Sequence, residues 1–193
     1  LQAVDHGTVR VDGRNVTRMA PYRRSRLGVA RTFQRLELFA AMSVQENIEC
    51  AAGMAGRTKG RPGAARATAE RLMTRLGLTP VAHIRSGVLP TGQARLVEVA
   101  RALATSPKVL LLDEPASGLS DTETDHFARL LVELTGEGLG ILLVEHDMGL
   151  VMSVCSNVVV LNFGRVLAVG APDAVRRDPA VLAAYLGTGA PHD

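Results

Sequence analysis

The chain has 193 residues, of which 47% are hydrophobic and 21% are charged, so it can bury a core and is not expected to be disordered. Its 22 basic and 19 acidic side chains give a formal net charge of +3, and the 3% content of aromatic residues argues against a nucleic-acid-binding surface. The 2 cysteines are too few for a disulfide framework, and no apolar run reaches the roughly 18 residues that a membrane-spanning helix needs.

The first part of the chain predicts extended structure. Gly7 to Val11 alternates as a strand does, and the turn pair Asp12-Gly13 follows it. Val29 to Gln34 is a second extended candidate. We therefore expect the chain to begin at the edge of a β-unit.

The next part predicts a helical insert over residues 36–88. Ser43 begins a helix that continues to Ala52, because Glu46 completes a capping box. Gly53 to Pro62 is rich in glycine and basic residues, which predicts a surface loop. The spacing of apolar residues from Ala64 to Leu76 predicts another helix.

Beyond the insert, apolar strands alternate with helices. Val109 to Asp113 and Ile141 to Glu145 are predicted as buried strands, and helices are predicted at Gln93 to Thr105 and Asp121 to Leu134. This order predicts a parallel sheet that is covered on both faces. The remaining predictions are a hairpin with strands at Val158 to Leu161 and Val166 to Val169 around Gly164-Arg165, then two short helices within Ala171 to Leu186.

Polar residues follow the two apolar runs at the ends where ligands bind in open parallel sheets. Asp113 is suited to a hydrated Mg²⁺, and Glu114 to polarising an attacking water as a general base. His146 is suited to donating a hydrogen bond to a transferring phosphoryl group. If the two strands are neighbours, the three side chains share one pocket. The alternative interpretation is that these residues form only a polar turn.

A third segment, Leu89 to Leu103 (LPTGQARLVEVARAL), places Thr91, Gly92 and Gln93 at the start of a helix. Free backbone N–H groups and the helix dipole make such a position an anion site. Taken alone, this turn is only a helix cap. Because the turn lies shortly before the two carboxylates, our functional hypothesis is that it is a phosphate site.

These segments together resemble the ATP-binding cassette (ABC) ATPase family. LPTGQ is similar to the family's signature motif, VLLLDEP to its Walker B motif, EHD to its H-loop, SGLSD from Ser117 to its D-loop, and Thr32-Phe33-Gln34 to its Q-loop. The motifs occur in the family's order and cover nearly the whole chain. The segments GVARTFQRLELFAAMSVQENI, EHDMGLVMSVCSNVVVLNFGRVLAVGAP and DPAVLAAYLG also resemble the ATPase subunits of branched-chain amino acid importers.

The resemblance implies an α/β fold, with a P-loop NTPase-like ABC ATPase core of mostly parallel sheet and a helical subdomain. We expect a single incomplete ABC ATPase domain over residues 1–193. Its expected parts are a RecA-like core of residues 1–35 and 89–170, a helical subdomain of residues 36–88, and a C-terminal helical tail of residues 171–193.

The family's Walker A loop, which needs Gly-Lys-Ser/Thr, has no counterpart in the sequence. Neither Lys59 nor Lys108 stands in that context. We therefore interpret the chain as N-terminally truncated, without the family's first strand, P-loop and helix, and expect weakened nucleotide affinity and exposed apolar surface.

The resemblance also implies roles for individual residues. Glu114 is expected to be the catalytic base, and His146 to contact the γ-phosphate of ATP. Asp113 and Gln34 are expected on the Mg²⁺ side of the site, with the Gln34 loop contacting a membrane subunit.

Other roles are implied across a dimer. Thr91, Gly92 and Gln93 are expected to bind ATP held by the opposite subunit of a head-to-tail pair. Two positions depart from the family pattern, because Pro90 replaces the usual signature serine and Ser120 replaces the usual D-loop aspartate. By its place in the D-loop, Ser120 is still expected at the bound nucleotide.

The function implied by the resemblance is an ATP-binding and hydrolysing subunit that energises an importer of branched-chain or related amino acids. The implied cofactors are ATP and Mg²⁺. The implied partners are transmembrane permease subunits, a second ATPase subunit in a homo- or heterodimer and, indirectly, a substrate-binding protein, but no nucleic acid. The permease would hold the chain at the cytoplasmic face of the cell membrane. The alternatives are a non-hydrolysing interaction module and a soluble ABC protein in translation or DNA repair.

Overall fold

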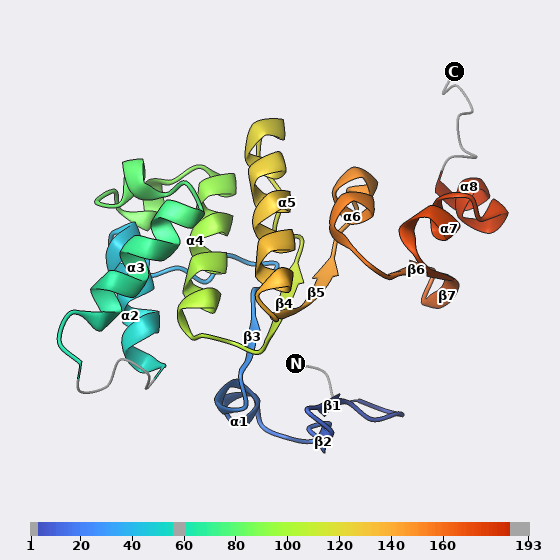
Figure 1. Ribbon diagram of the computed structural model, residues 1–193, viewed down its shortest axis with the longest axis horizontal. Coiled ribbons are helices and arrows are strands. Elements are labelled where there is room, and N and C mark those ends of the chain that lie inside the picture. Colours follow the sequence, from blue (N-terminus) through green and yellow to red (C-terminus); the bar gives the residue numbers. More distant parts are fainter. Residues whose placement is uncertain (1–3, 56–60, 186–193) are drawn as a thin grey trace. The chain divides into compact units, whose positions relative to one another are not determined.

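The computed structural model describes residues 4–55 and 61–185 (Figure 1). These belong to two compact units, Leu1–Val144 and Glu145–Asp193. Residues 1–3, residues 56–60 of the predicted surface loop and residues 186–193 of the predicted tail lie outside the described residues. Among residues 4–55 and 61–185, no helix is long and apolar enough to cross a membrane.

The first unit begins with a small hairpin and a short helix. Strands β1 (Arg10–Val11) and β2 (Arg14–Asn15) pair antiparallel, as the turn signal predicted. Asp12 and Gly13 both have positive φ angles, which is the conformation that a tight turn between paired strands needs. Helix α1 (Pro21–Arg26) was not predicted, because none of its residues is buried and its sequence carries no apolar period.

A three-stranded parallel sheet forms the centre of the first unit. Its strands are β3 (Val29–Arg31), β4 (Val109–Asp113) and β5 (Gly140–Val144), in the order β3-β4-β5 (Figure 1). Leu110 of β4 pairs with both Ala30 and Ile141. The predicted parallel sheet is therefore confirmed, and its two apolar runs are adjacent strands.

Within the first unit, one face of the sheet is buried more deeply than the other. Leu110 and Leu112 of β4 are fully buried, whereas Leu142 and Val144 of β5 are 59% and 54% exposed. Within the first unit, the predictions that β5 is a buried strand and that both faces of the sheet are covered are therefore wrong. The physical reason is that β5 is an edge strand, and the apolar residues on its two faces look alike in the sequence.

The predicted helices of the first unit are all present, with ends that shift by a few residues. They are α2 (Val44–Met54), α3 (Ala64–Arg75), α4 (Thr91–Ala104) and α5 (Asp121–Gly136). Two 3₁₀ turns, η1 (Thr79–Val81) and η2 (Ser86–Val88), connect α3 to α4. Helices α2, α3 and α4 pack against one another, and α4 also contacts β3 and β4.

Capping boxes explain where two of these helices begin. Ser43 caps α2 with Glu46, as predicted, and Ser120 caps α5 with Glu123 in the same way. In each box the serine side chain accepts the N3 amide while the glutamate accepts the serine amide. The sequence therefore specifies these two helix starts locally.

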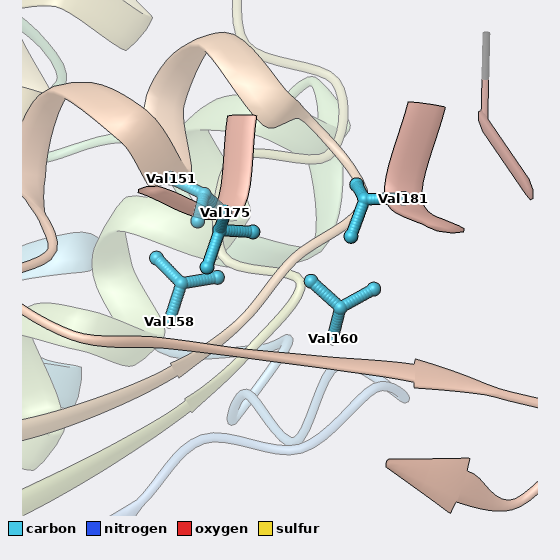
Figure 2. Close-up of a cluster of buried hydrophobic side chains, with 5 residues drawn as sticks. All are labelled: Val151, Val158, Val160, Val175 and Val181. Atoms are coloured by element: carbon cyan, nitrogen blue, oxygen red, sulfur yellow. The ribbon is translucent and has the colours of Figure 1, made fainter. Parts of the chain in front are cut away.

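The second unit packs a β-hairpin against three short helices. Strands β6 (Val158–Asn162) and β7 (Arg165–Gly170) pair antiparallel, and the helices are α6 (Met148–Val154), α7 (Pro172–Arg176) and α8 (Pro179–Tyr185). Five buried valines from α6, β6, α7 and α8 form its core (Figure 2). The hairpin is confirmed, but its turn is Phe163-Gly164, both at positive φ, and Arg165 belongs to β7 rather than to the predicted turn. Helix α6 was not predicted.

Candidate functional site

Asp113 is the last residue of β4 and lies at the carboxyl end of the central strand. Its Oδ2 is 3.3 Å from Nη2 of Arg31 on the neighbouring strand β3. Its backbone N–H donates to Oγ1 of Thr32 at 3.2 Å. Thr32 is buried, and its own N–H donates to the carbonyl of Leu111, so it continues the pairing of β3 and β4 to their ends. Sequence reasoning gave Arg31 and Thr32 no role beside the carboxylate.

Glu114 follows Asp113 with a backbone conformation that is uncommon outside glycine. Its φ is +46°, and its N–H donates to the carbonyl of Val144 at 2.9 Å. Left-handed conformations of this kind raise the energy of a non-glycine residue and persist where the surrounding structure fixes them. Here the last ladder bond to β5 and the buried Pro115 hold the half-buried Glu114 at the sheet edge.

Gln34 lies in the segment that leaves the carboxyl end of β3. Since β3 and β4 are parallel neighbours, this segment and Asp113 lie at the same edge of the sheet. The Gln34 side chain is exposed, and its carbonyl accepts from Nη2 of Arg95 on α4. The structure thus brings the segment with Gln34 to the same sheet edge as Asp113 and Glu114.

Arg95 and Glu98 form a buried ion pair on α4 that sequence reasoning missed. Nη1 of Arg95 is 3.3 Å from Oε2 of Glu98, and the side chains are only 10% and 5% exposed. Burial raises the pKa of the Glu98 carboxyl, although the Glu37 amide and the guanidinium of Arg95 act in the opposite direction. Two opposite charges three residues apart, among the apolar residues of α4, were the available signal.

Thr91, Gly92 and Gln93 are the first three residues of α4, as predicted. The N-cap residue is Pro90, and no side chain caps this end of the helix. Backbone N–H groups in an uncapped first turn can bind an anion. The local geometry therefore suits the predicted phosphate contact.

The first turn of α4 packs against the segment that precedes α5. A Cβ atom on Gly92 would lie 2.4 Å from the carbonyl oxygen of Gly118, which itself has φ of +83°. Ser120, two residues later, is the N-cap of α5, and its N–H donates to Oε2 of Glu123 at 2.8 Å. Ser120 therefore has a capping role, and its role at a nucleotide stays a prediction.

His146 belongs to the second unit, just before Asp147, the N-cap of α6. Its side chain is 76% exposed, and its Nδ1 is 3.7 Å from Oε2 of Glu145. The expectation that His146 shares a pocket with Asp113 and Glu114 concerns two separate units and stays a prediction.

The donor groups at the sheet edge fit a magnesium ion that arrives with its substrate. Among the described residues, no group of three or more His, Cys, Asp or Glu side chains is placed to hold a metal ion by itself. Mg²⁺ is commonly held by one or two protein carboxylates together with substrate phosphates. Asp113 offers one carboxylate, which is partly exposed, and Gln34 can add an amide oxygen.

The lysines do not supply a phosphate loop in the described residues. Lys108 stands immediately before β4, at the strand end opposite to Asp113, and its Nζ is 2.6 Å from Oδ2 of Asp12. Lys59 lies outside the described residues.

Comparison with known proteins gives consistent matches. A family model described as ABC transporter matches residues 1–117, and one described as branched-chain amino acid ATP-binding cassette transporter matches residues 165–191. The high-affinity branched-chain amino acid transport ATP-binding protein BraF of Pseudomonas aeruginosa is 38% identical, over 94% of this chain and 76% of its own length. Its counterpart LivG of Escherichia coli is 37% identical over the same shares. A solved structure of MJ1267, an ATP-binding cassette of an ABC transporter, aligns with a TM-score of 0.80 and 26% identity, over 94% of this chain and 77% of that one.

Proposed function

This chain belongs to the ABC transporter family, and we propose that it is the ATPase subunit that energises an importer of branched-chain or related amino acids. The observation that carries the catalytic part is the position of Asp113 and Glu114 at the carboxyl end of the central strand β4, at the same sheet edge as the segment with Gln34. The names of BraF and LivG support the substrate class, because both are described as branched-chain amino acid transport ATP-binding proteins.

In this proposal Glu114 is the general base for hydrolysis of ATP. Its carboxylate takes a proton from the attacking water, which Gln34 orients through its side-chain amide. The fixed backbone of Glu114 limits the positions that the carboxylate can reach, which favours a defined geometry for proton transfer.

Asp113 and Gln34 are proposed to hold Mg²⁺ at the nucleotide. The bound ion would neutralise the charge that develops on the phosphate oxygens. Arg31 pairs with Asp113 across β3 and β4, and this pair holds the carboxylate at the strand end. Because both side chains are about one third exposed, the pair is weak enough to rearrange when other groups bind.

The remaining residues are proposed to contact the phosphates of ATP. His146 is proposed to donate a hydrogen bond to the γ-phosphate. Thr91, Gly92 and Gln93 are proposed to present the N-terminus of α4 to ATP held by a second subunit in a head-to-tail dimer. The first turn of α4 supports this role, since its N-cap residue Pro90 makes no side-chain hydrogen bond to the turn.

The proposed partners are a transmembrane permease and, through it, a substrate-binding protein. Phe33 and Phe39, at the two ends of the segment that contains Gln34, are each more than two fifths exposed. Apolar side chains exposed in this way beside a catalytic segment support contact with another protein. Such contact would place the chain at the cytoplasmic face of the membrane.

The enzymatic proposal is tested by binding and hydrolysis of MgATP by the purified protein, made with any coding sequence that precedes residue 1 in its gene. Glu114→Gln should lower the turnover by a factor of about 10² to 10⁴ while ATP binding is retained. Glu70→Gln, on the exposed surface of α3, is the matched control and should keep normal turnover. Normal turnover in Glu114→Gln would overturn the assignment of the base.

Three further measurements separate the alternatives. A protein that binds its partners but never hydrolyses ATP, even when extended upstream within its gene, would be a non-hydrolysing interaction module. Tight MgATP binding by the 193-residue chain alone would contradict the predicted need for a Walker A lysine. ATP-dependent uptake of leucine by vesicles with the permease and binding protein tests the substrate class, and uptake of other solutes only would exclude it.

A further inference from the structure

Arg95 connects helix α4 to the backbone carbonyls that precede and follow the Cα atom of Gln34. Its Nη1 donates to the carbonyl of Phe33 at 2.7 Å, and its Nη2 donates to the carbonyl of Gln34. The two acceptors are adjacent carbonyls, and the planar guanidinium fork contacts both at once. Arg95 therefore fixes the path of the backbone at Gln34, whatever the conformation of the Gln34 side chain.

Two more residues of α4 extend this connection along the same segment. Oε1 of Glu98 accepts the N–H of Glu37 at 2.7 Å, and Nη1 of Arg101 donates to the carbonyl of Glu37. The guanidinium of Arg101 also lies 4.7 Å from the centre of the Phe39 ring. Since Arg95, Glu98 and Arg101 follow one another at three-residue intervals, they lie along one side of the helix.

The same helix begins with the turn proposed to contact ATP in the opposite subunit. Arg95 is less than one helical turn beyond Gly92, so a rigid movement of the first turn of α4 must move the guanidinium with it. The buried pair with Glu98 restrains the Arg95 side chain, because separating the two charges would leave one of them unpaired in the interior.

We propose that Arg95 is a positioning residue for Gln34, which couples the binding of nucleotide by Thr91–Gln93 in one site to the placement of Gln34 in the other. The inference rests on the proposed function, because it uses the roles assigned there to both motifs. Arg95 itself contacts only the protein. Its effect on hydrolysis is transmitted through the carbonyls of Phe33 and Gln34.

The informative variant is Arg95→Lys, made in the purified protein with any coding sequence that precedes residue 1 in its gene and assembled with its permease. Lysine keeps a positive charge for Glu98 but cannot contact two adjacent carbonyls with a planar fork. We expect the kcat for ATP to fall by roughly tenfold or more, with the KM changed less than threefold, because Gln34 is displaced while the groups that bind nucleotide are intact. Stimulation of hydrolysis by the transported substrate should also be lost.

Arg75→Lys is the matched control. Arg75 on α3 pairs with Glu133 and Glu137 of α5, at distances of 3.5 and 2.8 Å, and both partners lie outside the Gln34 segment. This variant tests whether replacing an arginine that joins other elements of the fold is enough to lower the kcat. It should keep the wild-type kcat and the wild-type stimulation.

Hydrogen exchange measured by mass spectrometry gives a readout that needs no turnover. In Arg95→Lys, amides of Phe33–Phe39 should exchange about tenfold faster than in the wild type, while amides of the α4 interior keep their protection. ATP should slow exchange of this segment in the wild type but not in the variant. Unchanged exchange together with unchanged kcat would overturn the role of Arg95. A wild-type protein without ATPase activity would instead contradict the proposed function. The exchange experiment would still test whether Arg95 holds the backbone at Gln34.

Discussion

Gly92 and Gly118 lie in direct contact, although 26 positions separate them in the sequence. A Cβ atom on Gly92 would be 2.4 Å from the carbonyl oxygen of Gly118 and 2.9 Å from its carbonyl carbon, distances at which the backbone has to shift. The first turn of α4 and the segment before α5 therefore pack directly against each other. The proposed signature turn cannot move without affecting the segment that leads to Ser120.

Gly92→Ala is expected to destabilise the protein by about 1–3 kcal/mol, because a buried methyl group would overlap backbone atoms that have little freedom to move. The measurement is the free energy of urea-induced unfolding. Gly136→Ala, at the last position of α5, is the control, since an added Cβ there meets no atom within 4 Å. It should be neutral or slightly stabilising. Equal effects of the two substitutions would show that the close contact is not present in solution.

Asn47→Ala is expected to cost about 2–4 kcal/mol, because its buried side chain satisfies backbone groups that would lose their partners. Oδ1 of Asn47 accepts the N–H of Phe39 at 3.0 Å, and Nδ2 donates to Oγ of Ser86 at 3.0 Å. Thermal and urea unfolding measure the loss. Asn157→Ala changes an exposed residue and should remain within about 0.5 kcal/mol of the wild type. A small effect at Asn47 would mean that water replaces its hydrogen bonds.

Ser43→Ala is expected to destabilise the protein by about 1 kcal/mol, because it removes the acceptor for the Glu46 amide at the start of α2. Ser120→Ala should have a similar effect at α5, where the same box is formed with Glu123. Equilibrium unfolding of each single variant checks the values. Additive losses in the double variant are expected, since the two caps belong to different helices.

The capping box at α2 also predicts a dependence of stability on pH. The hydrogen bond from the Ser43 amide lowers the pKa of Glu46 below its ordinary value of 4.5. The folded state therefore favours the carboxylate, and this contribution is present above pH 4.5 and is lost as the pH falls through the lower folded-state pKa. Glu46→Gln should lose less stability than the wild type on acidification below that pH, as measured by urea midpoints. If the dependence of stability on pH were the same in Glu46→Gln as in the wild type, Glu46 would not contribute to the loss of stability in acid.

Arg75→Met is expected to weaken the connection between α3 and α5. Arg75 pairs with two glutamates of α5, and its carbonyl lies 2.8 Å from Nε2 of His126 on the same helix. Because the glutamates are well exposed, we expect a loss of only about 0.5–1 kcal/mol, which should shrink as salt is added. A loss that does not respond to salt would assign the effect to packing of the arginine stem instead.

Local sequence patterns predicted the elements whose causes are local. The run Val109 to Asp113 forms β4 with those bounds, since a short apolar segment that ends in charged residues is typical of a central parallel strand. The box of Ser43 and Glu46 likewise placed the start of α2. Helices α1 and α6 were missed because they are short and carry little apolar periodicity.

The residues of the candidate site likewise divide into those that local patterns predicted and those that they did not. Asp113, Glu114 and Gln34 could be predicted, because strand ends and motif order mark them in the sequence. Arg95 could not be assigned a role, since its partners are carbonyl groups of Phe33 and Gln34, and every residue carries such a group. A contact between a side chain and a distant backbone leaves no pattern at the accepting position.

By itself, the sequence determined the kinds of elements, the start of α2 at its capping box and the family to which the chain belongs, because these depend on neighbouring residues and ordered motifs. Only the tertiary structure decided that one face of the sheet is buried more deeply than the other within the first unit, that Gly92 packs against Gly118, and that Arg95 holds the backbone at Gln34. Each of these depends on which distant surfaces meet. Steric exclusion and the burial of charge determine that choice, and they act between residues that are brought together only as the chain folds.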